Sequence, residues 1–368
     1  MTTSTTSEQA VRPAQTGQKA EWRVRQRRRK FFAKGGITTF TLLLCSLYLA
    51  PLAYGFLTSL KTETQISDPT SPILPYEPAT LEYEGKEYDI LNVTFEDGST
   101  QQLALYQKGR ESSQFLDPAN PNAEALIEWE GRWRALEPAR EFSPKWSNYP
   151  EAFEKINFAR LLGNTLMYAI TTTIMAVTSA AIVAYGFARY NFPFKNVLFI
   201  ILIATIILPP QVTLVPTYAF FTRIGWTGTW LPLIVPTIFS NAYNVFLMRQ
   251  YYLTIPREME EAAMIDGAGP VRTFVSVILP QAVPALTAVT LFHFFFAWND
   301  FFGPLIYLVG KPDLVPLSVG LTTFNGLFDS SPQLIQAASI MTIILPLTIF
   351  FFAQRIFIQG VVITGVDK

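Results

Sequence analysis

The side chains that could carry chemistry are few in this chain, and those inside apolar sequence are widely scattered. The 368 residues include one histidine, His293, and one cysteine, Cys45. A single cysteine excludes a disulfide framework and a cysteine-based metal site, and we expect Cys45 to be a small buried hydrophobe. No set of acids with helical spacing gathers at one end of an apolar run. The sequence therefore predicts neither catalytic residues nor a metal site.

Two ionisable residues, His293 and Asp300, lie seven positions apart in an apolar run and hence on one helix face. Such a group is a functional candidate by default. Hydrogen bonds between neighbouring helices also explain both residues, and we favour that interpretation because polar interhelical contacts are common. The Gly-Lys pairs at 85–86 and 310–311 lack the glycine spacing and the Ser or Thr of a phosphate-binding loop. The chain itself is therefore not expected to bind a nucleotide.

The composition is that of a membrane protein. Half of the residues are hydrophobic and 15% are charged, against about 25% charged in soluble domains. A membrane-spanning helix needs about 20 mostly apolar residues. Six runs meet that length: Ile37–Leu60, Leu161–Tyr185, Val197–Phe221, Trp230–Arg249, Val275–Leu308 and Leu334–Phe357. The third contains Pro209, Pro210 and Pro216, so we expect a bend there that faces the protein interior or a pathway.

Charge is strongly segregated along the chain and predicts its orientation. Residues 1–36 hold nine basic and two acidic residues, whereas residues 61–155 hold nine basic and 18 acidic residues. The basic N-terminus precedes the first span and six spans place both chain ends on one side, so both termini are expected in the cytoplasm, with residues 61–155 outside the membrane. We expect residues 1–36 to be disordered, most clearly the polar stretch 1–20.

Residues 61–155 are predicted to form a small α+β module outside the membrane. Apolar and polar residues alternate on both sides of Glu96-Asp97-Gly98, which is a strong β-hairpin signal. A helix is predicted over Asn122–Ala139, because Trp129 and Trp133 are four residues apart and would share one face.

The stretch 256–280 has an unusual order of residue types for so apolar a chain. Pro256 and three glutamates favour a helix start, and Gly267 favours a helix end. Met259, Ala262 and Ala263 would form a narrow apolar stripe between them. A short helix with a small-residue face is suited to a partner's socket, although a simple surface turn has the same composition. We expect Asp266 to cap the following turn or to pair with Arg257 or Arg272.

This stretch resembles the EAA loop of permease subunits of binding-protein-dependent ABC importers. The match consists of Glu261-Ala262-Ala263, then Gly267, then Val277-Ile278-Leu279-Pro280, with Val277 where the family prefers Ile. The longer run 255–268 is similar to the sugar-import branch. Residues 164–166, 184–189, 298–301 and 304–305 also resemble that branch, and the tail 354–368 resembles the end of its maltose-permease G-type subunits. Residues 62–141 lie outside the resemblance and look like an insertion.

The resemblance implies an all-α membrane protein with the six transmembrane helices of the type I ABC importer fold, in a bacterial or archaeal plasma membrane. The α+β module predicted from the residue pattern would be an insertion after the first helix. Together with the charge and hydropathy patterns, the resemblance gives a basic N-terminus at 1–36, a first helix at 37–60, the insertion module at 61–155, a permease domain at 160–357 containing the EAA loop 254–280, and a cytoplasmic tail at 358–368. The coupling residues carried over are Glu258, Glu261, Ala262, Ala263, Asp266, Gly267, Ala268 and Pro280.

The partners implied are a second permease subunit in a heterodimer, two cytoplasmic ATPase subunits that bind ATP and Mg²⁺, an external sugar-binding protein and membrane lipid, with no nucleic acid. No cofactor is expected on this chain, which would be a transport subunit and not an enzyme. Sugars are bound by amides and aromatic rings, so five residues are candidates for a sugar path: Asn164, Asn241, Asn244, Trp298 and Asn299.

Three other functions stay open at this stage. The chain could be a permease for a solute other than a sugar. A membrane enzyme with six spans, such as a glycosyltransferase, would need convergent acids or a metal site, and neither is evident. A structural scaffold is the remaining class. For the insertion, two roles compete: a cap on the permease's own outer loops, or a docking surface for the sugar-binding protein, which the acidic charge slightly favours.

Overall fold

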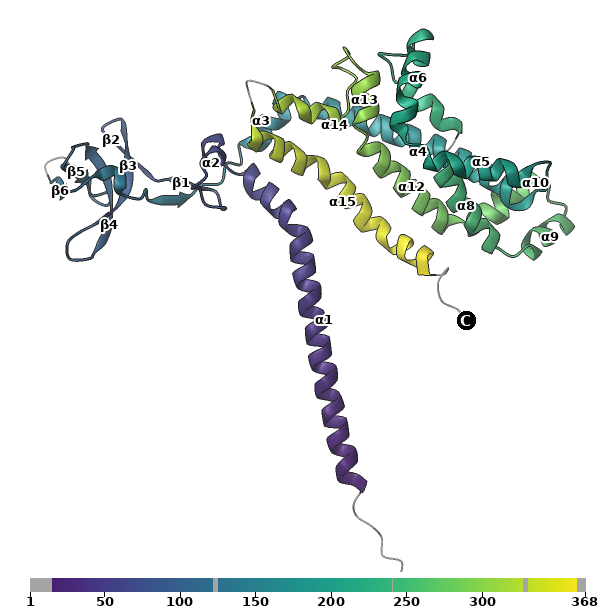
Figure 1. The fold of residues 1–368 in the computed structure, drawn as a ribbon, viewed down its shortest axis with the longest axis horizontal. Helices are drawn as coiled ribbons and strands as arrows, with labels where there is room; N and C mark the ends of the chain where they lie inside the picture. Colours follow the sequence, from purple (N-terminus) through teal and green to yellow (C-terminus); the bar gives the residue numbers. More distant parts are fainter. Residues whose placement is uncertain (1–14, 122–124, 240, 327–329, 363–368) are drawn as a thin grey trace, which may run out of the picture. The chain divides into compact units, whose positions relative to one another are not determined.

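The computed structural model describes residues 15–121, 125–239, 241–326 and 330–362, and Figure 1 gives the element labels used below. The chain divides into two compact units, residues 1–56 and 57–368. The first unit is built on one long helix, α1 (Gln15–Ser59). The predicted disorder is therefore wrong for residues 15–36, where Gln, Lys, Ala, Glu and Arg are good helix formers. Residues 1–14 and 363–368, which include the ends of both predicted cytoplasmic tails, lie outside the described residues.

Cys45 is exposed on α1, so the expectation of a buried position is wrong. The apolar part of this helix buries little of its surface within the chain. An apolar residue of a membrane helix needs no protein partner, because lipid is as apolar as a protein core.

The insertion module is almost entirely β-structure. A short helix, α2 (Glu63–Ser67), precedes a two-stranded antiparallel sheet of β1 (Tyr76–Pro78) and β7 (Arg140–Phe142). Between these strands runs a five-stranded antiparallel meander in chain order. Its strands are β2 (Thr80–Tyr83), β3 (Lys86–Thr94), β4 (Thr100–Gln107), β5 (Ser112–Leu116) and β6 (Ile127–Glu130). The hairpin predicted around residues 96–98 is confirmed, with Gly98 at φ +81° in its turn.

The helix predicted over residues 122–139 is wrong. The described part of that range contains strand β6 and a single 3₁₀ turn, η1 (Trp133–Ala135). Gly131 lies between β6 and η1 with φ +145°, and a Cβ at this position would collide with the ring of Trp129. Trp129 and Trp133 nevertheless pack against one cluster, whose core is Leu91, Val93, Leu103, Leu105 and Phe115. The two tryptophans share a side of the module, as predicted, but a strand and a turn place them there.

The two chain ends of the insertion meet at its base. Asn148 is buried and its Nδ2 donates to the carbonyl oxygens of Ser59 (2.8 Å) and Lys61 (2.9 Å). The Lys145 amide also donates to the Leu60 carbonyl at 2.9 Å. Burial lowers the pKa of Lys61, whose Nζ donates to the Pro72 carbonyl. The segment that leaves the first helix and the segment that enters the next are thus hydrogen-bonded together.

The remaining elements are helical. They are α3 (Asn148–Lys155), α4 (Phe158–Arg189), α5 (Lys195–Ile207), α6 (Pro210–Arg223), α7 (Leu231–Ile234), η2 (Val235–Phe239), α8 (Ala242–Thr254), α9 (Glu258–Ile265), α10 (Pro270–Thr273), the π-turn η3 (Phe274–Ile278), α11 (Leu279–Gln281), α12 (Val283–Trp298), α13 (Phe302–Tyr307), α14 (Leu317–Gly320), η4 (Leu321–Phe324) and α15 (Pro332–Val362). Among the described residues, four helices are long and apolar enough to cross a membrane, or up to six if each of two bent helix pairs is one span.

Helix α4 is the centre of the helical bundle and packs against both α8 and α12 (Figure 1). Its packed side carries Ala176, Ala180 and Ala184, all nearly inaccessible to solvent, at intervals of four residues. Small residues at this spacing allow helix backbones to approach closely, as is typical of helix packing in membranes. The bundle therefore owes its closeness to alanines on α4.

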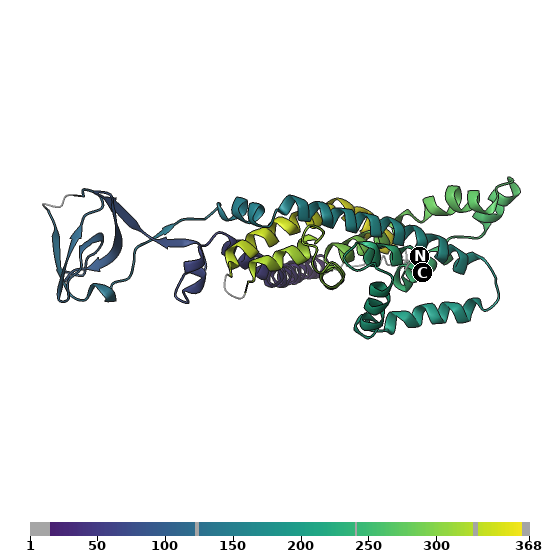
Figure 2. The ribbon, with the colours of Figure 1, turned by 90° about the horizontal axis from the view of Figure 1, so that it is seen from above.

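The third apolar run is broken as its prolines predict. Helices α5 and α6 meet at 99°, and Figure 2 shows α6 turning away from α5. Pro209 has no N–H group to continue the ladder of α5. Ile207 is 81% exposed beside the break, so the bend does not face the interior of this chain. That it faces a pathway stays a prediction.

Candidate functional site

The loop between α8 and α12 folds into the short helix that the sequence predicts. Helix α9 (Glu258–Ile265) ends at Asp266, and Gly267 follows at φ +80° in the left-handed region that favours glycine. The Gly267 amide donates to the Met264 carbonyl at 3.0 Å, and the Ala268 amide donates to the Ala263 carbonyl at 2.9 Å. These two bonds form a Schellman motif, which closes the helix at its last turn.

The outer side of α9 is exposed, and no other segment that the structure describes covers it. Glu258, Glu261 and Ala262 are exposed, Ile265 is 86% exposed, and Val271 on α10 is 77% exposed. Ile265 lies between the glutamates of α9 and Asp266, in a charged segment outside the candidate membrane spans, where lipid does not account for an exposed aliphatic group. Exposed apolar residues rimmed by charge are typical of a protein interaction site.

The inner side of α9 is held by a buried ion pair that the sequence analysis missed. Glu260 is 7% exposed, and its Oε1 lies 2.5 Å from Nε of Arg189, the last residue of α4. The contact is an ion pair without the angular geometry of a hydrogen bond, because neither of these two atoms has a hydrogen-bond partner. Arg189 Nη2 also donates to the Ile255 carbonyl at 2.7 Å. The sequence signal for this pair was that α9 begins with three glutamates. Two of them, Glu258 and Glu261, are exposed, and the third, Glu260, is buried.

Pro280 lies away from α9, at the start of the path back into the membrane. It lacks an N–H group, and the π-turn η3 (Phe274–Ile278) ends two residues before it. Ile278 is fully buried here and packs with Met248 and Tyr252 of α8. The bent pair α10–α12 turns by 79° in this region. Pro280 therefore shapes the base of the loop, whereas the other seven predicted coupling residues lie on α9 or its cap.

Neither role predicted for Asp266 is found in the described chain, because the following helix α10 begins without a side-chain cap and the predicted ion pair does not form. In the described chain Asp266 makes no salt bridge to Arg257 or Arg272. Asp266 is exposed as the C-terminal cap of α9, where solvent hydrates its carboxylate without a basic partner.

The five residues predicted for a sugar path are not brought together. Asn164 Nδ2 donates to the carbonyls of Asp313 and Val315, so it fastens α4 to the loop before α14. Asn244 is buried with its Nδ2 3.3 Å from His293 Nδ1, and Trp298 is buried against Phe294.

The last two candidates, Asn241 and Asn299, are exposed. Asn241 caps α8 by accepting from the Asn244 amide at 2.8 Å, and Asn299 Nδ2 donates to the Phe295 carbonyl at 2.8 Å. Asn241 and Asn299 are thus the two most accessible of the five candidates, whereas Asn164 is partly buried and Asn244 and Trp298 are buried. Asp300 accepts a hydrogen bond from the Tyr168 hydroxyl at 2.8 Å. With the contact of His293 to Asn244, this supports the interhelical role that we favoured for the two ionisable residues.

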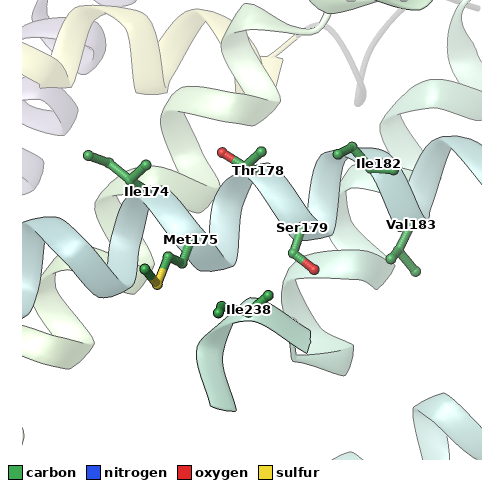
Figure 3. Close-up of a pocket in the computed structure, with 7 residues that line it drawn as sticks. All are labelled: Ile174, Met175, Thr178, Ser179, Ile182, Val183 and Ile238. Carbon is green, nitrogen blue, oxygen red and sulfur yellow. The ribbon is translucent and has the colours of Figure 1, made fainter. Parts of the chain in front are cut away.

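An open groove of about 410 Å³ runs along the outer face of α4 (Figure 3). Ile174, Thr178 and Ile182 follow one another at intervals of four residues on one side of α4, while Met175 and Ser179 point toward Ile238 of η2. The hydroxyls of Thr178 and Ser179 are the polar side-chain groups among its seven lining residues, which include neither an amide nor an aromatic ring. This groove alone does not offer the groups by which sugars are bound.

Comparison with known proteins places the chain in a family. Residues 176–363 match the binding-protein-dependent transport system inner membrane components, and the chain belongs to that family. A permease for uptake of osmoprotective compounds from Synechocystis sp. is 29% identical over 257 residues, 69% of this chain and 85% of that protein. An alpha-glucoside transport system permease from Rhizobium meliloti is 30% identical over 222 residues, 58% of each chain.

The fold agrees with this assignment. A chain in the crystal structure of a bacterial ABC transporter involved in import of the acidic polysaccharide alginate matches with a TM-score of 0.59 at 19% identity, covering 89% of this chain and 96% of that chain. The fold is thus that of a type I ABC importer permease. The protein is a membrane-embedded transport subunit, and ATP hydrolysis belongs to separate subunits of such transporters.

Proposed function

We propose that this permease carries a sugar or a related glycoside or polyol inward. Helix α9 couples this transport to ATP hydrolysis by two cytoplasmic ATPase subunits. The observation that carries the coupling role is the two-sided character of α9. Its inner side is fixed by the buried pair of Glu260 and Arg189, while Ala262 and Ile265 stay exposed on a loop. A helix that is rigid at its base and apolar outside is suited to seat in a partner's pocket.

The substrate class is supported by relatives whose names refer to alpha-glucosides and to osmoprotective compounds. The groove on α4 supplies two hydroxyls and no amide or aromatic ring. We therefore propose that the solute site is completed by a second permease subunit, different in sequence, which faces this groove. Screening glycosides and polyols against the binding protein that delivers solute to this permease tests the class. Binding of amino acids or peptides alone would favour a permease for another solute.

Purification of the complex from its native membrane tests the proposed assembly. A tag on this chain should bring down one second permease subunit and two copies of an ATPase subunit for each copy of the chain. Mass spectrometry of the intact complex in detergent measures this ratio. Recovery of the chain alone, from membranes that express the neighbouring subunits, would contradict the proposed function.

The orientation proposed places both termini in the cytoplasm and the insertion module outside. In a Cys45→Ser background, Glu96→Cys at the exposed tip of the β3–β4 hairpin should react with a membrane-impermeant maleimide in intact spheroplasts. Ser4→Cys should react only after the membrane is opened, because basic N-termini stay inside. The reverse labelling pattern, or labelling of both positions in intact spheroplasts, would overturn this topology.

A further inference from the structure

One guanidinium group, that of Arg189, joins three helices beneath the exposed loop. Arg189 is the last residue of α4, Glu260 lies in the first turn of α9, and Ile255 caps the end of α8. Nε of Arg189 lies 2.5 Å from the Glu260 carboxylate, and its Nη2 donates to the Ile255 carbonyl at 2.7 Å. The two charged side chains are only 5% and 9% exposed.

The surroundings of the pair are apolar and tightly packed. Tyr185, one turn before Arg189, contacts the rings of Tyr252 on α8 and Phe274 in η3, with centroids 6.0 and 4.7 Å away. Tyr252 is fully buried, and Ile255 is 7% exposed. In such surroundings a charge has no water to replace a lost partner, so the two charged groups are held to each other.

We propose that Arg189 and Glu260 are positioning residues that make α4, α8 and α9 move as one body, so that displacement of α9 is passed directly to α4. This inference rests on the proposed coupling function of α9 and names how the movement reaches the membrane. Helix α4 carries the groove of Figure 3 on its outer face, so a shift of its cytoplasmic end moves a surface that the proposed second subunit would cover.

The chain offers a matched control at the other end of the same helix. Arg160, near the start of α4, pairs with Asp313, and both side chains are substantially exposed, at 42% and 78%. Exposed ion pairs contribute little because water screens them. Arg160→Met therefore removes an arginine–carboxylate pair from α4 without touching α9.

The test uses the whole complex in proteoliposomes with its binding protein, and measures solute molecules moved per ATP hydrolysed. The main variant is the double change Arg189→Met with Glu260→Met, because replacing both members of a buried pair by apolar groups of similar size often preserves folding. The complex should assemble and hydrolyse ATP, while solute moved per ATP falls at least threefold. Arg160→Met should keep the wild-type ratio.

An unchanged ratio in the double variant would overturn the proposal. Should the double variant fail to assemble, Arg189→Lys decides, because the guanidinium reaches the Glu260 carboxylate and the Ile255 carbonyl from two separate nitrogens, Nε and Nη2, whereas lysine offers a single nitrogen without this fixed fork. The proposal expects a lower ratio for Arg189→Lys, and a wild-type ratio would contradict it. If the wild-type complex moves no solute with ATP, the proposed function itself fails, which is a separate outcome from a defect confined to these variants.

Discussion

Replacing Ala262 by tryptophan should leave the permease folded in the membrane and lower solute uptake by about fivefold or more. Ala262 is exposed on α9, whereas Glu260 faces the chain, so an indole at 262 points away from the packed side. If α9 seats in a close-fitting pocket of the ATPase, overpacking costs about 1–3 kcal/mol. That is a loss of about 5- to 150-fold in docking affinity. Uptake and ATP hydrolysis stimulated by the binding protein are the two measurements.

Asn191→Trp is the matched control for this substitution. Asn191 is exposed in the connection between α4 and α5, which the predicted topology places on the same membrane side as α9. It should be neutral, because a tryptophan there is equally exposed but lies outside the loop. Wild-type uptake by the Ala262→Trp variant at equal abundance would show that α9 occupies no close-fitting socket.

The coupling loop shows what local sequence can and cannot predict. Gly267 and the acidic first turn predicted both the existence and the end of α9, because these signals act within a few residues. The burial of Glu260 could not be predicted in the same way. It depends on Arg189, 71 positions earlier, and on how α4 and α8 bring that residue under the loop. Three neighbouring glutamates have the same chemistry in sequence and differ only in what the fold places beside them.

In the insertion module and at the predicted sugar path, local sequence led to predictions that the fold does not follow. The spacing of Trp129 and Trp133 fits a helix, yet β6 pairs with β5 and Gly131 breaks the range, so long-range strand pairing outweighed local periodicity. Asn164 and Asn244 have the right chemistry for a sugar but are hydrogen-bonded within the bundle. Polar side chains of membrane helices serve packing and transport alike, and only their neighbours distinguish the two roles.

Removing the outer part of the insertion should raise the concentration of binding protein that gives half-maximal uptake by about tenfold at low salt. Pro78 and Arg140 are paired across β1 and β7, so a short Gly/Ser turn can replace residues 79–139 and leave the base intact. This segment holds 12 acids and five basic residues, a net charge of −7. Acidic charge at this density speeds encounter with a basic partner, by about 10- to 1,000-fold where steering is strong.

Salt distinguishes docking from a structural cap. Docking through charge predicts that the wild-type half-saturation concentration rises between 20 and 200 mM salt, at about the range where the Debye length falls below 10 Å. The shortened permease should show a flattened salt dependence and a nearly unchanged maximal rate. A lost maximal rate with an unchanged half-saturation concentration, or failure of the complex to assemble, would show instead that the module is a cap on the permease.

The central claim is that this chain is the membrane path of an ATP-driven importer, and solute accumulation in proteoliposomes tests it most directly. Vesicles would hold the purified complex, with ATP on the side of the ATPase subunits and solute-loaded binding protein on the other. The account predicts accumulation that requires ATP, binding protein and this chain together, with a glycoside or polyol as the solute. Equal accumulation in vesicles whose complex lacks this chain would contradict it.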